Sequence, residues 1–273
     1  MNTIALEIDR VGKVFRRKER GRSPLRRTRR NEVVALAEVS LSVQRGEIFG
    51  VLGPNGSGKS TLIRLISTLL LPDSGAIRVF GHDVGSEAFA VKRLINRVSV
   101  DAAFFKKFSP LENLMYAARL YGMPIREARK RMREIMRRLG LKEETFTQPM
   151  EHMSRGMQQK VAVARGFLTS PILLLLDEPT TGLDPHSKRD VQAFIHEIRS
   201  KHNATVLLTT HDMNEADRLC DRIAIIDEGK IIALDTPEEL KKLVSKRNGH
   251  DPTLEDVFIE LTGHRMEEKE SQG

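Results

Sequence analysis

The stretch that decides the fold reads Gly53-Pro54-Asn55-Gly56-Ser57-Gly58-Lys59-Ser60, followed by Thr61. It fits the spacing G-x-x-x-x-G-K-[ST] and stands between an apolar run at residues 48–52 and a run with helical spacing at residues 61–71. Glycines let successive backbone N–H groups curl around phosphate oxygens. Lys59 can reach the outer phosphates of a nucleotide, and the Ser60 hydroxyl can ligate Mg²⁺. The alternative, a glycine-rich turn with a chance lysine, does not account for the strand and helix around it.

Two adjacent acids follow another strongly apolar run. Asp177 and Glu178 come directly after residues 172–176, which read as a buried strand. Asp177 is placed to hold the metal directly or through water. Glu178, on the other side of the strand end, can polarise water for attack on the γ-phosphate. A strand-terminating acidic turn is the structural alternative, and the phosphate loop upstream favours the catalytic interpretation.

Strand-like and helix-like patterns alternate around these motifs. Residues 4–8 and 33–43 alternate apolar and polar, as half-buried strands do. From about 105 to 168 the pattern is helical, and Ser109-Pro110-Leu111-Glu112 has the form of a helix cap. A β-α-β-α-β order follows, which favours parallel strands covered by helices. We expect an α/β fold with a mostly parallel sheet, an N-terminal antiparallel β part and an α-helical subdomain inserted at approximately 101–168.

Composition bounds the class of protein. The chain is 40% apolar and 30% charged, and its single cysteine, Cys220, excludes an internal disulfide and favours a reducing cytoplasm. No apolar run approaches the ~20 residues that span a bilayer. We expect residues 1–240 to form one domain, with 241–273 a helical extension and a frayed tail.

Further motifs occur in a fixed order along the chain. They are Phe15 after the first strand, Met153-Ser154-Arg155-Gly156-Met157, Thr181-Gly182-Leu183-Asp184 after the paired acids, and Thr210-His211 after a strand. With the phosphate loop, they make the sequence resemble the ATP-binding cassette (ABC) ATPases over residues 4–263. The resemblance implies that these motifs are, in order, the aromatic residue stacked on adenine, the signature motif, the D-loop and the switch histidine.

This resemblance implies a P-loop NTPase with an ABC ATPase core, which binds ATP and Mg²⁺ and uses Glu178, His211 and Lys59 in catalysis. It also implies a head-to-tail pair of subunits, in which Ser154 and Gly156 of one subunit face the ATP held by the other, with Asp184 nearby. A helix N-terminus there would supply new donors to the γ-phosphate. The structural alternatives are helix caps, a structural histidine and, for Phe15, simple core packing.

Two positions depart from the family pattern. Asp101 stands where the family usually opens the helical subdomain with glutamine, and we expect Asp101 to reach Mg²⁺ through a water. The alternative is a surface acid one residue out of register. Arg155 and Met157 replace the frequent Gly and Gln of the signature. This signature and the ending at residues 252–263 resemble the ABC-2 type subunits of drug, lipid-linked and polymer exporters.

The expected function is therefore an ATPase that powers an exporter. Its partners would be a separate transmembrane permease subunit and a second ATPase subunit, in a homodimer or a heterodimer. The alternative class is an ABC ATPase without transport, in nucleic-acid repair or translation. Only 94 residues separate Ser60 from Ser154, too few to hold a long coiled coil, and the chain carries one cassette. These features favour transport.

The positive charge is concentrated in one segment. Residues 16–30 hold nine Lys or Arg and one acid, which equals the whole net charge of +8. With one apolar residue, Leu25, the segment cannot bury itself, so we expect an exposed loop. The alternatives are a solvated loop and an electrostatic contact with anionic lipid head groups or with an acidic cytoplasmic face of the partner. No aromatic residue interleaves the arginines, so no specific nucleic-acid binding is expected. The expected localisation is cytoplasmic, peripheral on the inner face of the cell membrane.

Overall fold

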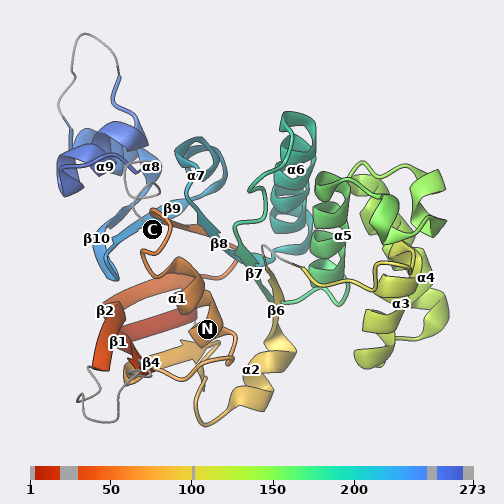
Figure 1. Cartoon of the computed structure of the whole chain (residues 1–273), viewed down its shortest axis with the longest axis horizontal. Helices are drawn as coiled ribbons and strands as arrows, with labels where there is room; N and C mark the ends of the chain where they lie inside the picture. The colour runs from red at the N-terminus through yellow and green to blue at the C-terminus, as the bar shows by residue number, and fades with distance from the viewer. Residues whose placement is uncertain (1–3, 19–29, 100–101, 245–250, 267–273) are drawn as a thin grey trace, which may run out of the picture.

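An antiparallel sheet opens the fold. The computed structural model describes residues 4–18, 30–99, 102–244 and 251–266 (Figure 1). The sheet contains, in spatial order, β2 (Arg30–Gln44), β1 (Ile4–Lys18), β4 (Ser74–Val79) and β5 (His82–Asp83). All its neighbouring strands run antiparallel. The expected antiparallel β part is therefore present.

A second sheet, of six strands, forms the centre of the molecule. In spatial order its strands are β10 (Lys230–Asp235), β9 (Arg222–Asp227), β3 (Ile48–Leu52), β8 (Thr205–Thr210), β7 (Leu173–Asp177) and β6 (Ile95–Val98). All neighbours run parallel except β10 and β9. Because parallel strands end at the same edge, the segments that follow β3, β7 and β8 meet there.

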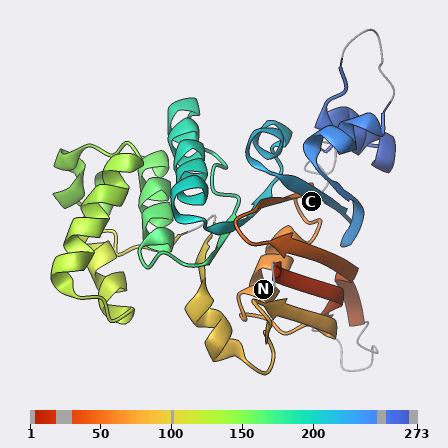
Figure 2. The same cartoon turned by 180° about the vertical axis from the view of Figure 1, so that it is seen from behind.

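Helices cover both faces of this sheet (Figures 1 and 2). They are α1 (Lys59–Ile66), α2 (Ala88–Leu94), α3 (Pro110–Leu120), α4 (Ile125–Arg138), α5 (Arg155–Phe167), α6 (Pro185–His202), α7 (Met213–Leu219), α8 (Pro237–Lys242) and α9 (Leu254–Thr262). α3, α4 and α5 lie together at one end of the molecule, beyond β6, as the inserted helical subdomain. No helix of the described residues is both long enough and apolar enough to cross a membrane.

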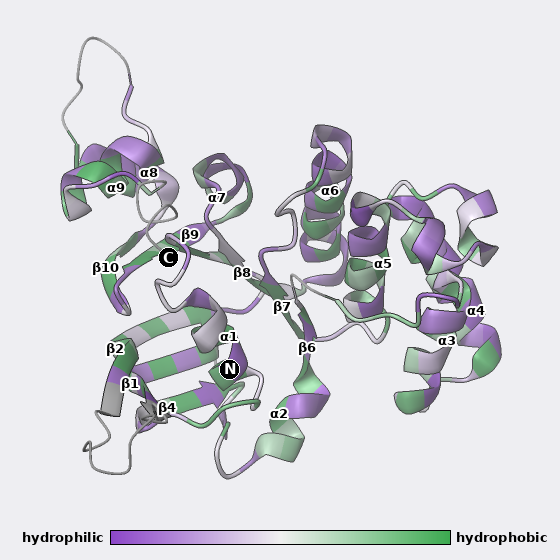
Figure 3. Cartoon of the chain, in the orientation of Figure 1, coloured by the Kyte–Doolittle hydropathy of each residue, from purple (hydrophilic) through white to green (hydrophobic). Residues whose placement is uncertain are grey.

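The central sheet separates two hydrophobic cores. Alternate residues of β7 point to opposite sides: Leu174 and Leu176 join the core with α5 and α6, whereas Leu173 and Leu175 join the core with α1 and the antiparallel sheet. In Figure 3, the central strands are correspondingly hydrophobic. Burial on both faces holds the ends of the central strands rigidly. The residues that follow each strand are therefore held in fixed positions.

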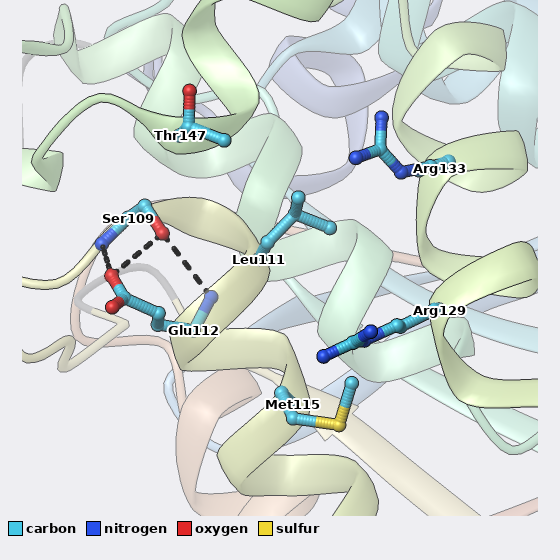
Figure 4. A pocket seen from close by; sticks show the side chains of 7 residues that line it. All are labelled: Ser109, Leu111, Glu112, Met115, Arg129, Arg133 and Thr147. Carbon is cyan, nitrogen blue, oxygen red and sulfur yellow. Dashed lines mark hydrogen bonds between the residues drawn. The ribbon is translucent and has the colours of Figure 1, made fainter. Parts of the chain in front are cut away.

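The cap of α3 forms as the sequence predicts. Ser109 Oγ accepts a hydrogen bond from the Glu112 backbone N–H, and the Glu112 carboxylate accepts from the Ser109 backbone N–H (Figure 4). Both residues line a cavity between α3 and α4, together with Arg129 and Arg133. The Glu112 carboxylate is thus occupied by the cap, and the cap lowers the pKa of Glu112.

The structure corrects two expectations and adds elements that the sequence patterns did not predict. The pairing of β1 and β2 extends further toward their connection than expected, with Arg16 opposite Glu32. The segment 16–30 therefore begins within a strand and not in a loop. Residues 19–29 lie outside the described part of the chain. α1 ends at Ile66 instead of near residue 71, because Thr68 adopts a left-handed conformation with φ of 60°. The sequence patterns also missed α2, β6 and β10, which are short or edge elements.

Candidate functional site: a nucleotide site at the strand ends

The phosphate loop turns directly out of β3. A Cβ at Gly53 would lie 2.2 Å from the Ile226 carbonyl oxygen, so only glycine fits there. Gly58 has φ of 107° and caps α1 without any side-chain hydrogen bond. A helix N-terminus of this kind can bind an anion. The buried Ser57 Oγ has no hydrogen-bond partner within the described structure. A glycine-rich loop before a helix N-terminus is a site that suits a polyphosphate.

Lys59 lies inside the loop that it follows. Its buried Nζ donates to the carbonyl oxygens of Gly53 at 2.8 Å and Pro54 at 3.0 Å. The same Nζ lies 3.3 Å from Glu178 Oε1, across the sheet edge. The buried ammonium group of Lys59 thus lies between the phosphate loop and Glu178.

Ser60 and Asp177 meet as the sequence predicts for a metal site. The Ser60 hydroxyl donates to Asp177 Oδ1 at 3.0 Å, and Thr209 Oγ1 donates to the same oxygen at 2.9 Å. Oxygen ligands of this kind suit Mg²⁺, which takes its remaining ligands from phosphates and water. Consistent with that division, the described residues contain no cluster of three or more His, Cys, Asp or Glu able to hold a metal alone.

Glu178 is held from three sides. Its Oε2 accepts from Thr181 Oγ1 at 3.0 Å and lies 3.2 Å from His211 Nδ1, while Oε1 faces Lys59. Burial raises the pKa of Glu178, but hydrogen bonding to His211 and Thr181 and the Lys59 charge outweigh it and lower the pKa to about 2. The backbone of Glu178 has φ of 49°, a strained conformation typical of functional sites. The acid is therefore ionised and fixed in place.

An apolar wall completes the site from the other sheet. Phe15 lines the same cavity as the phosphate-loop residues Asn55, Gly56, Gly58, Lys59, Ser60 and Thr61. Val33, Val34 and Ala35 of β2 line it as well, and sequence reasoning missed them. Val33 and Val34 are more than half exposed, and one signal was available: two adjacent valines in an alternating strand cannot both face the core.

Comparison with known proteins agrees with this geometry. The family model described as ABC transporter matches residues 36–181, more than half of the chain. The chain belongs to the ABC transporter family. The daunorubicin resistance ATP-binding protein DrrA3 of Streptomyces coeruleorubidus is 43% identical over 76% of this chain and 65% of its own length. The linearmycin resistance ATP-binding protein LnrL of Bacillus subtilis is 39% identical over 82% and 68%.

Solved structures of the ABC transporter family share the fold. The structure of an ATP binding subunit of an ABC transporter has a TM-score of 0.77 at 29% identity and covers 94% of this chain and 99% of that chain. A dimeric bacterial ABC transporter cassette has a TM-score of 0.73 at 25% identity, over 85% and 98%. The expected ABC ATPase fold is confirmed. The chain spans about two thirds of the first two curated relatives, 65% and 63% of their lengths.

The signature residues lie apart from the cavity that the phosphate loop lines. Ser154 is the exposed N-cap of α5, and its side chain accepts from the Met157 N–H at 3.3 Å. A Cβ at Gly156 would lie 3.2 Å from Asp184 Oδ2, so the signature and the D-loop are neighbours. Asp184 caps α6 by accepting from His186 N and Ser187 N. Both helix-cap readings hold, and a role of these residues toward a second subunit stays a prediction.

Asp101 falls outside the described residues, so its predicted contact with Mg²⁺ stays a prediction. In the sequence, Asp101 follows β6, which ends at Val98. β6 pairs with β7, whose last residue is Asp177, and Arg97 Nη2 of β6 lies 3.9 Å from Asp177 Oδ2. Strand β6 thus runs beside the strand that ends in Asp177.

Proposed function

We propose that this chain is the ATP-hydrolysing, Mg²⁺-dependent subunit of a membrane exporter of a drug, lipid-linked or polymeric substrate. The observation that carries the proposal is the convergence of Lys59, Ser60, Asp177, Glu178 and His211 at one sheet edge, from segments as far as 152 residues apart. In this proposal, Lys59 binds the outer phosphates, and Ser60 and Asp177 hold the metal. Glu178 and His211 orient the attacking water. The bound metal would supply charge neutralisation of the phosphates.

Relatives support export over the alternatives. DrrA3 is named for daunorubicin resistance and LnrL for linearmycin resistance, and both are described as ATP-binding proteins. A non-transport ABC ATPase, of the repair or translation type, has no support among these relatives. Within the proposal, residues 1–240 are the cassette and 241–273 an extension to it.

The proposed partners are a second ATPase subunit and a separate permease subunit. Ser154 is exposed and does not line the cavity of its own phosphate loop, as expected of a residue that acts on a second subunit. A cavity on the helical subdomain supports the proposal of a permease contact. Its lining includes Phe105, Tyr116 and Tyr121, which are about half exposed, and Leu120, which is 72% exposed. Contiguous exposed apolar groups mark interaction sites.

ATP hydrolysis by the purified chain tests the enzymatic part of the proposal. Phosphate release should require Mg²⁺, stop on chelation with EDTA and fall to background in Lys59→Ala, because the phosphate cradle loses its cation. A matched control is Lys92→Ala on α2, a lysine outside the site cavity, which should retain full activity. Equal release by wild type and Lys59→Ala would end the ATPase assignment.

The basic segment gives a separate prediction, that residues 16–30 attract the chain to anionic lipid at the inner face of the membrane. Basic residues near an anionic leaflet contribute roughly 1 kcal/mol each. Half of the +8 would give about 4 kcal/mol, or ~10³ in partitioning. Purified chain should therefore sediment with anionic vesicles and not with neutral ones, and 1 M salt should abolish the binding because the Debye length falls to ~3 Å.

Two variants distinguish an effect of the segment 16–30 from an effect of the total positive charge of the chain. Neutral residues at Arg26, Arg27, Arg29 and Arg30 should remove vesicle binding. Neutral residues at four basic positions of α4 remove the same charge elsewhere and should leave binding intact; they are Arg126, Arg129, Lys130 and Arg133. Undiminished binding by the first variant, or equal loss in both, would reduce the segment to a solvated loop.

A further inference from the structure

A buried carboxylic acid lies behind the catalytic residues without contacting the nucleotide cavity. Glu215 of α7 is 1% exposed. Its Oε1 accepts a hydrogen bond from Thr180 Oγ1 at 2.6 Å and a longer one from Gln192 Nε2 of α6 at 3.3 Å. Its Oε2 is buried and has no hydrogen-bond partner among the described residues. A buried carboxyl group with so few partners destabilises the fold, and such groups persist where they serve a function.

The contacts of Glu215 close a ring around the catalytic acid. On one side, the Glu215 backbone N–H donates to Asp212 Oδ1 at 2.9 Å, and Asp212 follows His211 directly. On the other side, Thr180 precedes Thr181, whose hydroxyl donates to Glu178 Oε2. His211 Nδ1 reaches the same Glu178 oxygen, so the two arms meet there. Residue 215 thus contacts the turn after β7 through its side chain and the turn after β8 through its backbone N–H.

From this geometry we propose that Glu215 is a positioning residue for hydrolysis, which holds the His211 turn and the turn at residues 178–181 in register so that His211 meets Glu178 Oε2. The proposal rests on the proposed ATPase function. Gln192 of α6 donates to the same Glu215 oxygen that accepts from Thr180, and Asp184 is the N-cap of this helix. An ion pair between Lys188 of α6 and Asp212 braces the His211 turn from the same side. Helix α6 therefore contacts the turn at residues 178–181 through Glu215 and the His211 turn through Lys188 and Asp212.

Two variants of Glu215 test the ring. Glu215→Ala removes the acceptor of Thr180 and should lower the turnover number by ~10- to ~100-fold, the cost of slight misplacement of catalytic groups. ATP affinity should change less than ~3-fold, because the phosphate loop is outside the ring. Glu215→Gln keeps an oxygen acceptor for Thr180 and should restore turnover to within ~3-fold of wild type.

A control on the same helix separates positioning from stability. Asp217 of α7 pairs with Lys241 of α8 and takes no part in the ring, so Asp217→Ala should leave turnover unchanged. If Glu215→Ala does not fold, Thr180→Val provides the second test, since it deletes the opposite partner with little change of shape. Thr180→Val should lower turnover in the same way.

The imidazole of His211 gives a readout that does not depend on ATP hydrolysis. In protein labelled with ¹³C-histidine, the His211 resonance, assigned by its loss in His211→Ala, should move in Glu215→Ala and Thr180→Val and stay in place in Asp217→Ala. A wild type that does not hydrolyse ATP would overturn the proposed function and leave this test intact. An unmoved His211 resonance, turnover within ~2-fold of wild type in folded Glu215→Ala, or an equal loss in Asp217→Ala would overturn the positioning role.

Discussion

Glu178→Gln is expected to bind ATP as wild type does and to hydrolyse it at least ~100-fold more slowly, the range of a catalytic acid–base group. The amide keeps the size of the carboxylate and can still accept from Thr181, but it cannot take a proton from water. It also removes the negative charge 3.3 Å from Lys59. ATP should therefore remain bound between two subunits, and a nucleotide-bound dimer should accumulate in size-exclusion chromatography.

The low pKa of Glu178, about 2, sharpens this prediction. A carboxylate with that pKa is a weak base, and the Lys59 charge is one of its causes. An ATP that attracts Lys59 to its phosphates would remove this cause and raise the basicity of Glu178 where it is needed. Because the folded pKa lies below the usual 4.5, the ionised acid stabilises the fold above pH 4.5, and this contribution disappears as the pH falls toward 2.

A matched control is Glu38→Gln. Glu38 also has a left-handed backbone, with φ of 53°, but its side chain is exposed on β2. This variant should hydrolyse ATP at the wild-type rate, so any loss in Glu178→Gln belongs to the site. Near-normal phosphate release by Glu178→Gln in a single-turnover assay would remove the acid from the catalytic role.

Mixing two inactive variants is expected to restore hydrolysis. Lys59→Ala empties the phosphate loop of its cation, and Ser154→Ala removes the hydroxyl proposed to reach the ATP of the second subunit. In a two-fold dimer of one subunit of each kind, one site combines an intact Lys59 with an intact Ser154. Random mixing should therefore return about one quarter of the wild-type sites, and activity should rise above that of either variant alone.

The helix cap must be separated from the shared site in this experiment. Ser154 caps α5, and loss of a cap costs about 1 kcal/mol of stability by itself. Ser109 caps α3 and lies outside the site cavity, so Ser109→Ala should lose similar stability in thermal unfolding and keep its ATPase activity. Mixed dimers that are confirmed by mass spectrometry and yet stay inactive would contradict sharing of the sites.

Local patterns in the sequence determined the parts of the site that depend on consecutive residues. Gly53, Gly58 and Lys59 form one turn, and hydrogen bonds within a few residues set its shape. The cap at Ser109 and the acids at the end of β7 are local in the same sense. Local geometry is encoded by neighbours in the chain, so spacing was enough to predict the phosphate loop, the capped helix and the two acids.

The tertiary structure alone decided which distant residues meet. β3 lies between β9 and β8, and β8 lies beside β7, an order that the sequence of elements does not specify. That order brings Ser60 to Asp177 and His211 to Glu178. The antiparallel sheet adds Phe15, Val33 and Val34 to the lining of the phosphate-loop cavity. The folded structure also creates the contacts of the buried Glu215, which no spacing in the sequence predicts. The physical reason is that strand pairing and two-sided burial join segments far apart in the chain, and only the folded sheet fixes their register.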